Sequence, residues 1–295
     1  MDVDVDGDGD VDVTVTGFSR NPNYPRQRIL PILRHKHALL RPATVLCFVL
    51  MQLIAAAMEE ELQLAMVLCQ DREKKENQGV CYWQARRAEK EFIFFKTGIG
   101  PRRSASNLQR ILNLLVPSHI LLIGYAGALD PNLKLADLVA IRNALGCSLS
   151  GNDPALGNLQ LDREFELTEA DAIVESARSL GLRAFAGNAL TSAHVLGIPE
   201  DKHFLYKKYG ASIVDMETAA VARIAASKNI PLSCIRAVSD EAEDTFLAPF
   251  SYNPSANIAA RAVKIIGAGI QSYQQWKMNS QTAGETLNRF LAQYL

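Results

Sequence analysis

Residues 213–245 read IVDMETAAVARIAASKNIPLSCIRAVSDEAEDT and carry the clearest helix and strand signals of the chain. The alanine-rich run 215–229 predicts a helix, because Asp215 is a good amino-terminal cap and Pro231 follows the end of the run. The apolar run 232–240 predicts a buried strand that ends in an acid. A helix followed directly by a buried strand indicates an α/β fold.

Two carboxylates in this stretch have positions that suit a ligand site. Glu217 falls in the first turn of the predicted helix, and Asp240 lies at the carboxyl end of the predicted strand, where open α/β sheets bind ligands. A purely structural interpretation also stands, in which Glu217 complements the helix dipole and Asp240 caps a turn. These two residues alone leave both interpretations open.

Composition bounds the class of protein. A chain of 295 residues, 48% of them hydrophobic, can bury a substantial core as one large α/β domain or as two smaller ones. The formal net charge of −1 gives no electrostatic case for binding nucleic acid. The five cysteines and five histidines show neither CxxC nor metal-ligand spacing. We therefore expect no metal, no disulfide framework and a reducing, cytoplasmic location.

Residues 1–45 are predicted to be a disordered extension. Residues 2–12 alternate Asp with Val or Gly, which is typical of low-complexity disorder. They imitate an EF-hand calcium loop, but Val13 occupies the place of the required glutamate. Residues 18–41 then carry six Lys or Arg and no acid, which also indicates an unpacked segment.

An apolar run at 43–58 follows this basic stretch, and the pair imitates a signal peptide. The run is short for a membrane-spanning helix, is rich in strand formers and ends in three glutamates at 59–61. We interpret it as the first core strand and expect no membrane segment. A natural start near Met51 is a second possibility that these residues leave open.

Several predicted strands end in glycine loops or acids. The strand at 91–96 leads into TGIG at 97–100, and the strand at 119–123 leads into GYAG at 124–127. Glycines let backbone N–H groups approach a ligand closely. One such loop would indicate only a tight turn, but its repetition, together with the acids that end two other strands, favours a binding site.

Periodicity and helix breakers place the remaining elements. Helices are predicted at 62–71, 104–115, 170–180, 199–209, 255–274 and 282–295, and strands at 137–142 and 184–190. Residues 72–91 are predicted to be a loop with a small hairpin, and residues 146–160 a polar loop. From these boundaries we expect a main domain at 46–275 and a helical tail at 276–295.

Five motifs occur together: MEEE at 58–61, TGIG, GYAG, VDMETAAVA at 214–222 and IRAVSD at 235–240. In this order and spacing they resemble the nucleoside phosphorylase and hydrolase superfamily over residues 47–272, and most of all the 5′-methylthioadenosine/S-adenosylhomocysteine nucleosidases. The resemblance implies a single-domain, three-layer α/β/α fold with a curved mixed central sheet, like that of purine nucleoside phosphorylase. It also implies hydrolysis of the N-glycosidic bond of a purine nucleoside, without a cofactor. The implied assembly is a homodimer or higher homo-oligomer in which a neighbouring chain closes part of the pocket.

The resemblance assigns chemistry to three acids. Asp240 would protonate N7 of the leaving base or hydrogen-bond to it, and partial burial would favour the protonated carboxyl that this requires. Glu217 would accept hydrogen bonds from the ribose hydroxyls and favour a positively charged sugar. Glu61 would position and deprotonate the attacking water.

Further pocket residues follow from the same resemblance. Met216 would pack against the ribose, and Arg236 would help to hold the water and the nearby acids. Backbone groups near Val195 and Leu196 would contact the edge of the purine. The other implied binding residues are Met58, Tyr125, Gly127 and Ser239.

Two departures from the family pattern bear on the substrate. Tyr125 stands where many nucleosidases carry serine, which adds bulk on the ribose side. The sequence TSAHVL at 191–196 replaces the family's acidic and aromatic purine loop, so the stacking partner is either Val195 or a residue from elsewhere. His194 is expected at the rim of the site, because no acid partner lies near it in the sequence.

Three rival interpretations remain. A phosphorylase needs cations for its phosphate, but Ile123 stands where these enzymes carry arginine, and Arg102 and Arg103 are the only nearby substitutes. A catalytically silent nucleoside-binding or storage protein would share the fold, yet would have no chemical need of all three acids. Enzymes that act on hopanoid-type or futalosine-type nucleosides would share these acids.

Overall fold

The computed structural model describes residues 2–5, 11–14, 51–149, 159–245 and 258–295. The chain divides into two compact units, Met1–Cys47 and Phe48–Leu295. In the first unit, β1 (Asp2–Val5) pairs antiparallel with β2 (Val11–Thr14). The rest of the extension expected at 1–45, and the part of the apolar run before residue 51, lie outside the described residues.

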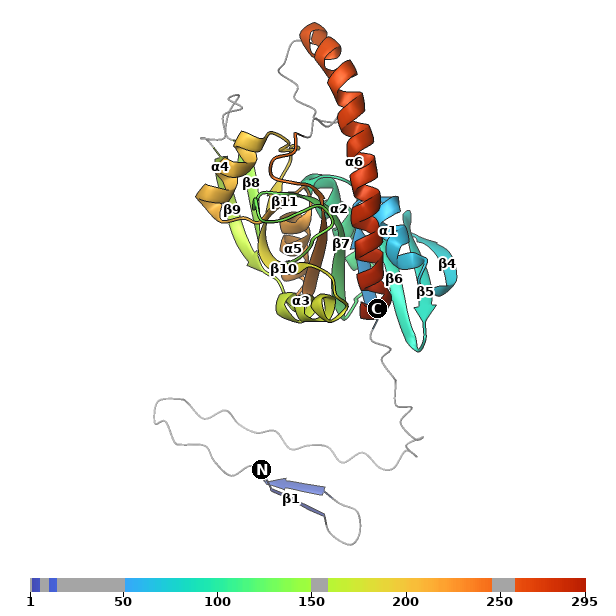
Figure 1. The fold of residues 1–295 in the computed structure, drawn as a ribbon. Coiled ribbons are helices and arrows are strands. Elements are labelled where there is room, and N and C mark those ends of the chain that lie inside the picture. Colours follow the sequence, from blue (N-terminus) through green and yellow to red (C-terminus); the bar gives the residue numbers. More distant parts are fainter. Residues whose placement is uncertain (1, 6–10, 15–50, 150–158, 246–257) are drawn as a thin grey trace, which may run out of the picture. The chain divides into compact units, whose positions relative to one another are not determined.

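The second unit is organised around one mixed sheet (Figure 1). Its strands are β3 (Gln52–Ala56), β4 (Gln70–Asn77), β5 (Val80–Arg87), β6 (Lys90–Lys96), β7 (His119–Ala128), β8 (Leu138–Leu149), β9 (Leu159–Glu166), β10 (Ala184–Ser192), β11 (Ile213–Asp215) and β12 (Leu232–Asp240). The order is β11-β10-β8-β12-β7-β3-β6-β5-β4, and β9 pairs with β8. Because β11 also pairs with β7, the sheet curves until five of its strands form a closed ring. The predicted α/β class with a curved mixed sheet is confirmed.

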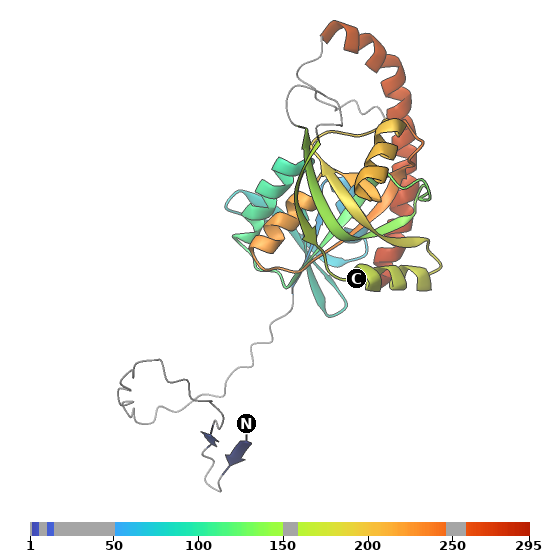
Figure 2. The ribbon, with the colours of Figure 1, turned by 90° about the vertical axis from the view of Figure 1, so that its left-hand side faces the viewer.

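Helices cover both faces of the sheet (Figure 2). They are α1 (Glu59–Met66), α2 (Pro101–Leu112), α3 (Ala170–Ser179), α4 (Pro199–Tyr209), α5 (Thr218–Ser227) and α6 (Ile258–Tyr294). Apolar side chains of α2 and α5 form one hydrophobic cluster with the sheet, and those of α1, α3 and α6 form another. The sheet with one layer of helices on each face makes the three-layer α/β/α arrangement.

The central parallel strands place the ends of four motifs at one edge of the sheet. β3 pairs in parallel with β6 and β7, and β7 pairs in parallel with β12. All nine residues of β12 are buried, as expected for a parallel strand that is covered on both faces. In the register of β12 with β7, Asp240 lies opposite Gly127, and in that of β11 with β7, Val214 also lies opposite Gly127.

Three local predictions need correction. The loop expected at 146–160 is largely strand, because β8 continues to Leu149 and β9 returns antiparallel beside it, with 150–158 outside the described residues. The helix expected at 62–71 begins at Glu59 instead, since three glutamates suit the positive end of the helix dipole, and it ends at Met66. The three-residue strand β11 was not predicted, because it is too short to show a period.

The carboxyl-terminal residues form one helix where two were expected. α6 runs without a break from Ile258 to Tyr294, across the boundary predicted at 275 and 276. Its last turns pack along α1 (Figure 1), and Asn288 Nδ2 donates a hydrogen bond of 2.7 Å to the Leu64 carbonyl. The buried face of these turns comprises Ala283, Leu287, Phe290 and Leu291. Residues 276–295 therefore contribute to the core.

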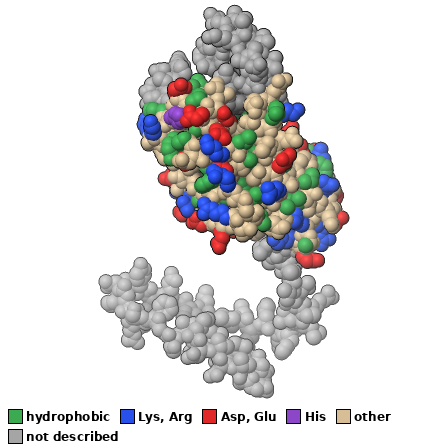
Figure 3. All heavy atoms as spheres, viewed as in Figure 1, with side chains coloured by type: hydrophobic (Ala, Val, Ile, Leu, Met, Phe, Trp, Pro, Cys, Tyr) green, Lys and Arg blue, Asp and Glu red, His purple; other side chains and the backbone are tan. Residues whose placement is uncertain are grey.

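Charges on the surface are mixed. On the face drawn in Figure 3, basic and acidic side chains are interspersed, in keeping with the formal net charge of −1. None of the helices in the described part of the chain is both long and apolar enough to cross a membrane.

Phe290→Ala tests whether the last turns of α6 belong to the core. Phe290 is fully buried, so the truncation should lower the free energy of unfolding by about 3–5 kcal/mol in urea denaturation. The matched control is Arg289→Ala, since Arg289 is exposed on the same helical turn and its loss should change stability by less than about 0.5 kcal/mol. Equal, small effects of both changes would show that the last turns do not stabilise the fold.

Candidate active site

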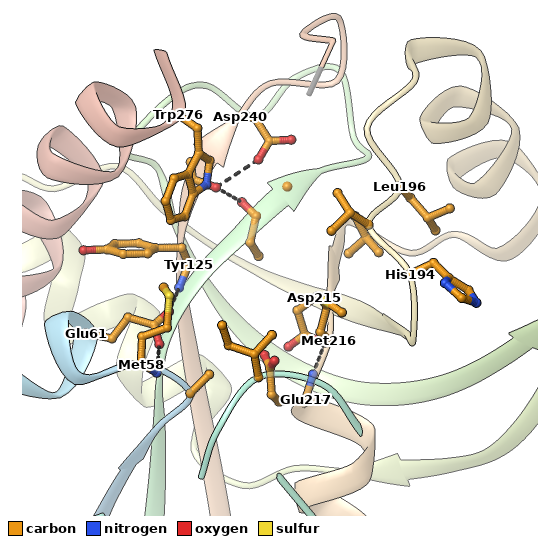
Figure 4. Close-up of a pocket in the computed structure, with 17 residues that line it drawn as sticks. Met58, Glu61, Tyr125, His194, Leu196, Asp215, Met216, Glu217, Asp240 and Trp276 are labelled. Atoms are coloured by element: carbon orange, nitrogen blue, oxygen red, sulfur yellow. Dashed lines mark hydrogen bonds between the residues drawn. The ribbon is translucent and has the colours of Figure 1, made fainter. Parts of the chain in front are cut away.

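A pocket of about 260 Å³ opens at the sheet edge where the motifs meet (Figure 4). Its lining includes four carboxylates, from α1, β11, the start of α5 and the end of β12: Glu61, Asp215, Glu217 and Asp240. The other lining residues are Ala57, Met58, Ile99, Tyr125, Ala126, Gly127, His194, Val195, Leu196, Val214, Met216, Ser239 and Trp276. All the residues proposed from the sequence line this pocket except Arg236, which lies buried beneath it.

Glu61 is held rigidly by backbone donors. Met58 N donates to Glu61 Oε2 at 2.9 Å, and Tyr125 N donates to Glu61 Oε1 at 3.0 Å. Burial raises the pKa of Glu61, and Arg236 and these backbone N–H groups act in the opposite direction. The GYAG loop thus holds the acid of the MEEE motif through its backbone, while the Tyr125 ring points away from Glu61 in Figure 4.

Glu217 is fixed by the TGIG loop. Its Oε1 accepts a hydrogen bond of 2.9 Å from Gly100 N, at the amino end of α2. Glu217 itself precedes the first residue of α5 and is buried. Burial, with Asp215 as a further contribution, raises the pKa of Glu217 to about 8, although Arg236 acts to lower it. The side chain is therefore largely protonated at neutral pH.

Arg236 lies under these acids as their common counter-ion, and it is 0% exposed. Its Nη2 lies 2.6 Å from Asp215 Oδ2 and 3.7 Å from Glu217 Oε2, and it donates to Thr218 Oγ1 at 2.9 Å. Burial alone would lower the pKa of Arg236, but Asp215 and the other acids raise it further above its ordinary value. Its Nε and Nη1 find no hydrogen-bond partner among the described residues.

Asp215, which the sequence predicted only as a helix cap, also bonds to side chains of other elements. Its Oδ1 accepts a hydrogen bond of 2.7 Å from Thr191 Oγ1, and its Oδ2 accepts one from Thr218 Oγ1. It also accepts a hydrogen bond of 3.2 Å from the backbone N of Thr218, the first residue of α5, and so caps the helix as predicted. The helix begins later than expected, so Glu217 and not Asp215 directly precedes it. The same carboxylate therefore joins β10, α5 and the guanidinium of Arg236.

The GYAG motif lies within β7 and not in the loop expected after residue 123, and two of its glycines are required by close approach. A Cβ atom on Gly124 would lie 2.5 Å from Arg236 Nη1 and 2.6 Å from Glu61 Oε1. A Cβ atom on Gly127 would lie 2.7 Å from Asp240 Oδ2. A side chain at either glycine would therefore force Arg236, Glu61 or Asp240 to move from its position in the site. These glycines admit the carboxylates and the guanidinium, whereas the sequence suggested that they admit a ligand.

The far end of the pocket is built around Asp240. Ser239 Oγ donates to Asp240 Oδ1 at 2.9 Å, and Lys202 Nζ donates to Asp240 Oδ2 at 2.6 Å. Figure 4 shows Trp276 beside Asp240 at this end, with Leu196 and His194 across the pocket from it. The ammonium of Lys202 is a partner of Asp240 that the sequence analysis did not include.

Sequence reasoning missed Lys202 and Trp276. Lys202 lies on the same face of α4 as the buried Leu205, three residues later, so a lysine on the apolar face was the available signal. Trp276 comes from α6, far along the chain from every motif, and its sequence carries no comparable signal. His194, which was expected at the rim of the site, lines the pocket and is exposed.

No cluster of three or more His, Cys, Asp or Glu side chains in the described ranges is arranged to hold a metal ion. The four carboxylates of the pocket face cationic side chains instead: Arg236 for the three near β11 and α1, and Lys202 for Asp240.

Comparison with known proteins matches the chain to one superfamily, whose named relatives include phosphorylases and nucleosidases. The profile of the phosphorylase superfamily matches residues 52–271. A DeoD-type purine nucleoside phosphorylase of Thermoanaerobacter sp. (strain X514) is 27% identical over 149 residues, which is 49% of this chain and 61% of the relative, less than two thirds of its length. A 5′-methylthioadenosine/S-adenosylhomocysteine nucleosidase of Geobacillus thermodenitrificans is 28% identical over 194 residues, 63% of this chain and 82% of the relative.

The fold is also that of solved structures. The crystal structure of 5′-methylthioadenosine/S-adenosylhomocysteine nucleosidase from Helicobacter pylori with butyl-thio-DADMe-Immucillin-A superposes with a TM-score of 0.64. The superposition covers 82% of this chain and 98% of that chain at 20% identity. At this level of identity the likeness concerns the fold.

Glu217→Gln should flatten the pH dependence of stability between about pH 5 and 8. The folded pKa of about 8 lies above the ordinary value of 4.5, so in this window the folded chain keeps a proton that the unfolded chain has lost. Stability is then greatest at the acidic end and falls as pH rises, by at most about 1.4 kcal/mol per pH unit from this residue. An amide does not titrate and removes this contribution.

The measurement is urea unfolding of both proteins at about pH 5, 6.5 and 8. Other titrating groups, including Glu61 and His119, are common to both chains, so the difference between the two slopes reports Glu217 alone. Parallel pH dependences would mean that Glu217 is ionised throughout the window.

Proposed function

The chain belongs to the phosphorylase superfamily, and from that premise we propose that it hydrolyses the N-glycosidic bond of a purine nucleoside. The substrates we propose are 5′-methylthioadenosine, S-adenosylhomocysteine or both, with adenine as the released base. The nucleosidase from Geobacillus thermodenitrificans is the relative that suggests this substrate class.

The observation that carries the choice of water over phosphate is the charge of the pocket. Its lining has four carboxylates and, among the described residues, no lysine or arginine. Phosphate is about doubly charged near neutral pH and needs paired cations when it is buried. Arg102 and Arg103, the substitutes considered from the sequence, are exposed and do not line the pocket, and Ile123 is buried in β7. Arg236 is already paired with Asp215.

Glu61 and Arg236 are the groups we propose for holding the attacking water. They approach each other beside Gly124, where one offers a carboxylate oxygen and the other offers N–H groups without partners. A water needs both kinds of partner, and a carboxylate with a raised pKa is a better base near neutral pH. Glu61 would take the proton of the water as its oxygen bonds to the ribosyl carbon.

The neighbouring acids suit the sugar. As the glycosidic bond breaks, the ribosyl group gains oxocarbenium character, which nearby negative charge stabilises. Glu217 and Met216 line the pocket between Glu61 and the purine side, and Glu217 has a second carboxyl oxygen beyond the one that Gly100 holds. Because Glu217 is largely protonated at neutral pH, we assign it to hydrogen bonds with the ribose hydroxyls and not to stabilising the charge of the sugar. We assign Met216 to the face of the ring.

Trp276 is the residue we propose for stacking on the base. It lies beside Asp240 and across the pocket from Leu196, so a flat purine whose edge meets Asp240 would lie between the indole and the 195–196 backbone. The resemblance left open which residue replaces the family's aromatic loop. We propose that this indole, a side chain of α6, takes that place.

Trp276→Ala should weaken binding of the nucleoside and of adenine by about 10- to 100-fold, since one base stacked on an aromatic ring contributes about 1–3 kcal/mol. The matched control is Trp83→Ala, because Trp83 lies in β5 and does not line the pocket. Binding is measured by calorimetry with adenine, which needs no turnover. An unchanged dissociation constant would remove Trp276 from the base site.

Product identity tests the proposed reaction. In phosphate-free buffer, 5′-methylthioadenosine should give adenine and a free reducing sugar, and millimolar phosphate should neither raise the rate nor produce a sugar 1-phosphate. Mass spectrometry of the products with and without phosphate is the measurement. Cleavage that depends strictly on phosphate would make the chain a phosphorylase. Tight binding of adenine without cleavage in either buffer would support a silent binding protein.

A further inference from the structure

Lys202 is buried without exposure to solvent, in contact with one of the acids of the pocket. Its Nζ donates to Asp240 Oδ2 at 2.6 Å, to the Glu241 carbonyl at 2.7 Å and to the Asp244 carbonyl at 3.2 Å. An ammonium has three N–H donors, so all three are used. Burying a charged lysine is costly unless it is paired, so the ion pair with Asp240 is what allows Lys202 to be buried here.

The pair fixes both oxygens of the Asp240 carboxylate. Oδ2 accepts the hydrogen bond from Lys202 Nζ and lies so close to Gly127 that a Cβ atom on this glycine would be 2.7 Å away. Oδ1 accepts a hydrogen bond from Ser239 Oγ. In both of these hydrogen bonds an oxygen of Asp240 is the acceptor. The acid that faces the base is therefore in direct contact with a buried ammonium, the side chain of Lys202.

The charged groups around the pair have other partners. Glu241 pairs with Lys134 at 2.9 Å, and the Asp244 carboxylate accepts a hydrogen bond of 2.8 Å from Glu241 N. His203, the next residue on α4, pairs with Glu243 at 2.8 Å. Lys202 is thus the cation in direct contact with Asp240 among the described residues.

We propose that Lys202 is the proton source for the leaving base, and that its proton reaches the base through Asp240. This inference rests on the proposed nucleoside cleavage. The glycosidic C–N bond breaks and its electron pair goes to the purine. In one concerted step a proton moves from Lys202 Nζ to Asp240 Oδ2 and on to N7 of the base, so that Asp240 ends as the carboxylate it was and Lys202 is left as a neutral amine. After the base has left, water that enters the pocket returns a proton to Lys202 through Asp240, which lines the pocket, and Glu61 releases to solvent the proton that it took from the attacking water.

The test compares a purine nucleoside with its N7-methylated counterpart. In the methylated compound the base already carries the positive charge that protonation would give, so it leaves without a proton. Lys202→Met removes the proton source and keeps the length of the side chain. We expect kcat on the unmethylated nucleoside to fall about 100-fold or more, and kcat on the methylated one to fall less than about tenfold. KM should change little for either.

Lys202→Arg is the second variant. Arginine keeps the positive charge beside Asp240 but does not release its proton, so it should also be slow on the unmethylated nucleoside and near normal on the methylated one. The matched control is Lys207→Met, an exposed lysine on the same helix, which should leave both rates unchanged. Unfolding curves establish that each variant is folded.

Three outcomes would overturn the inference. Equal losses on the two nucleosides would show that Lys202 only holds Asp240 and the 241–244 turn in place. Full activity of Lys202→Arg on the unmethylated nucleoside would show that charge alone is needed. A wild-type chain that cleaves neither nucleoside, with or without phosphate, would overturn the proposed function and this inference together, whereas phosphate-dependent cleavage would overturn the hydrolysis alone.

Discussion

The buried guanidinium of Arg236 is the interaction on which the pocket depends. Three acids, Glu61 from α1 and Asp215 and Glu217 from the junction of β11 with α5, are nearly removed from water. Carboxylates that are buried in one pocket repel one another and are costly to desolvate, so they need a common cation. Arg236 supplies it from the middle of β12, a strand that is itself buried along its whole length, which fixes the position of the charge.

The backbone around this cation follows from the same constraint. Gly124 has no side chain because Arg236 Nη1 and Glu61 Oε1 pass within 3 Å of where a Cβ atom would lie. The parallel pairing of β3, β7 and β12 brings their carboxyl ends to one edge, so that a helix start and two glycine loops can each supply backbone N–H groups there. Burial of the charges and the order of the strands are therefore parts of one arrangement.

The sequence predicted those parts of the site that a local pattern specifies. Glu61, Glu217 and Asp240 each stand at the end of a predicted strand or the start of a predicted helix, and the structure brings all three to one pocket. The continuous α6, the short β11 and the partners of Asp215 were not predictable in this way. Each depends on contacts between residues far apart in the chain, which leave no period in the sequence.

Lys202 marks the limit of sequence reasoning more clearly. A lysine between polar residues in PEDKHFLYKKY suggests an exposed position, and only its spacing from Leu205 points to the interior. Its effect is also contrary to the expectation for Asp240, since partial burial alone would favour a protonated carboxyl whereas the ammonium favours a charged one. The charged side chain in direct contact with this acid belongs to none of the five motifs.

The two ends of the pocket consequently differ in charge. Around the proposed ribose position, three acids share one guanidinium, and even with Glu217 protonated at neutral pH no excess of positive charge remains. At the proposed base position, Asp240 is neutralised by Lys202. Cleavage of a nucleoside makes the sugar more positive and the base more negative. The arrangement favours that separation of charge, because the leaving base meets a balanced pair that can release a proton, while the sugar faces acids whose single cation lies behind them.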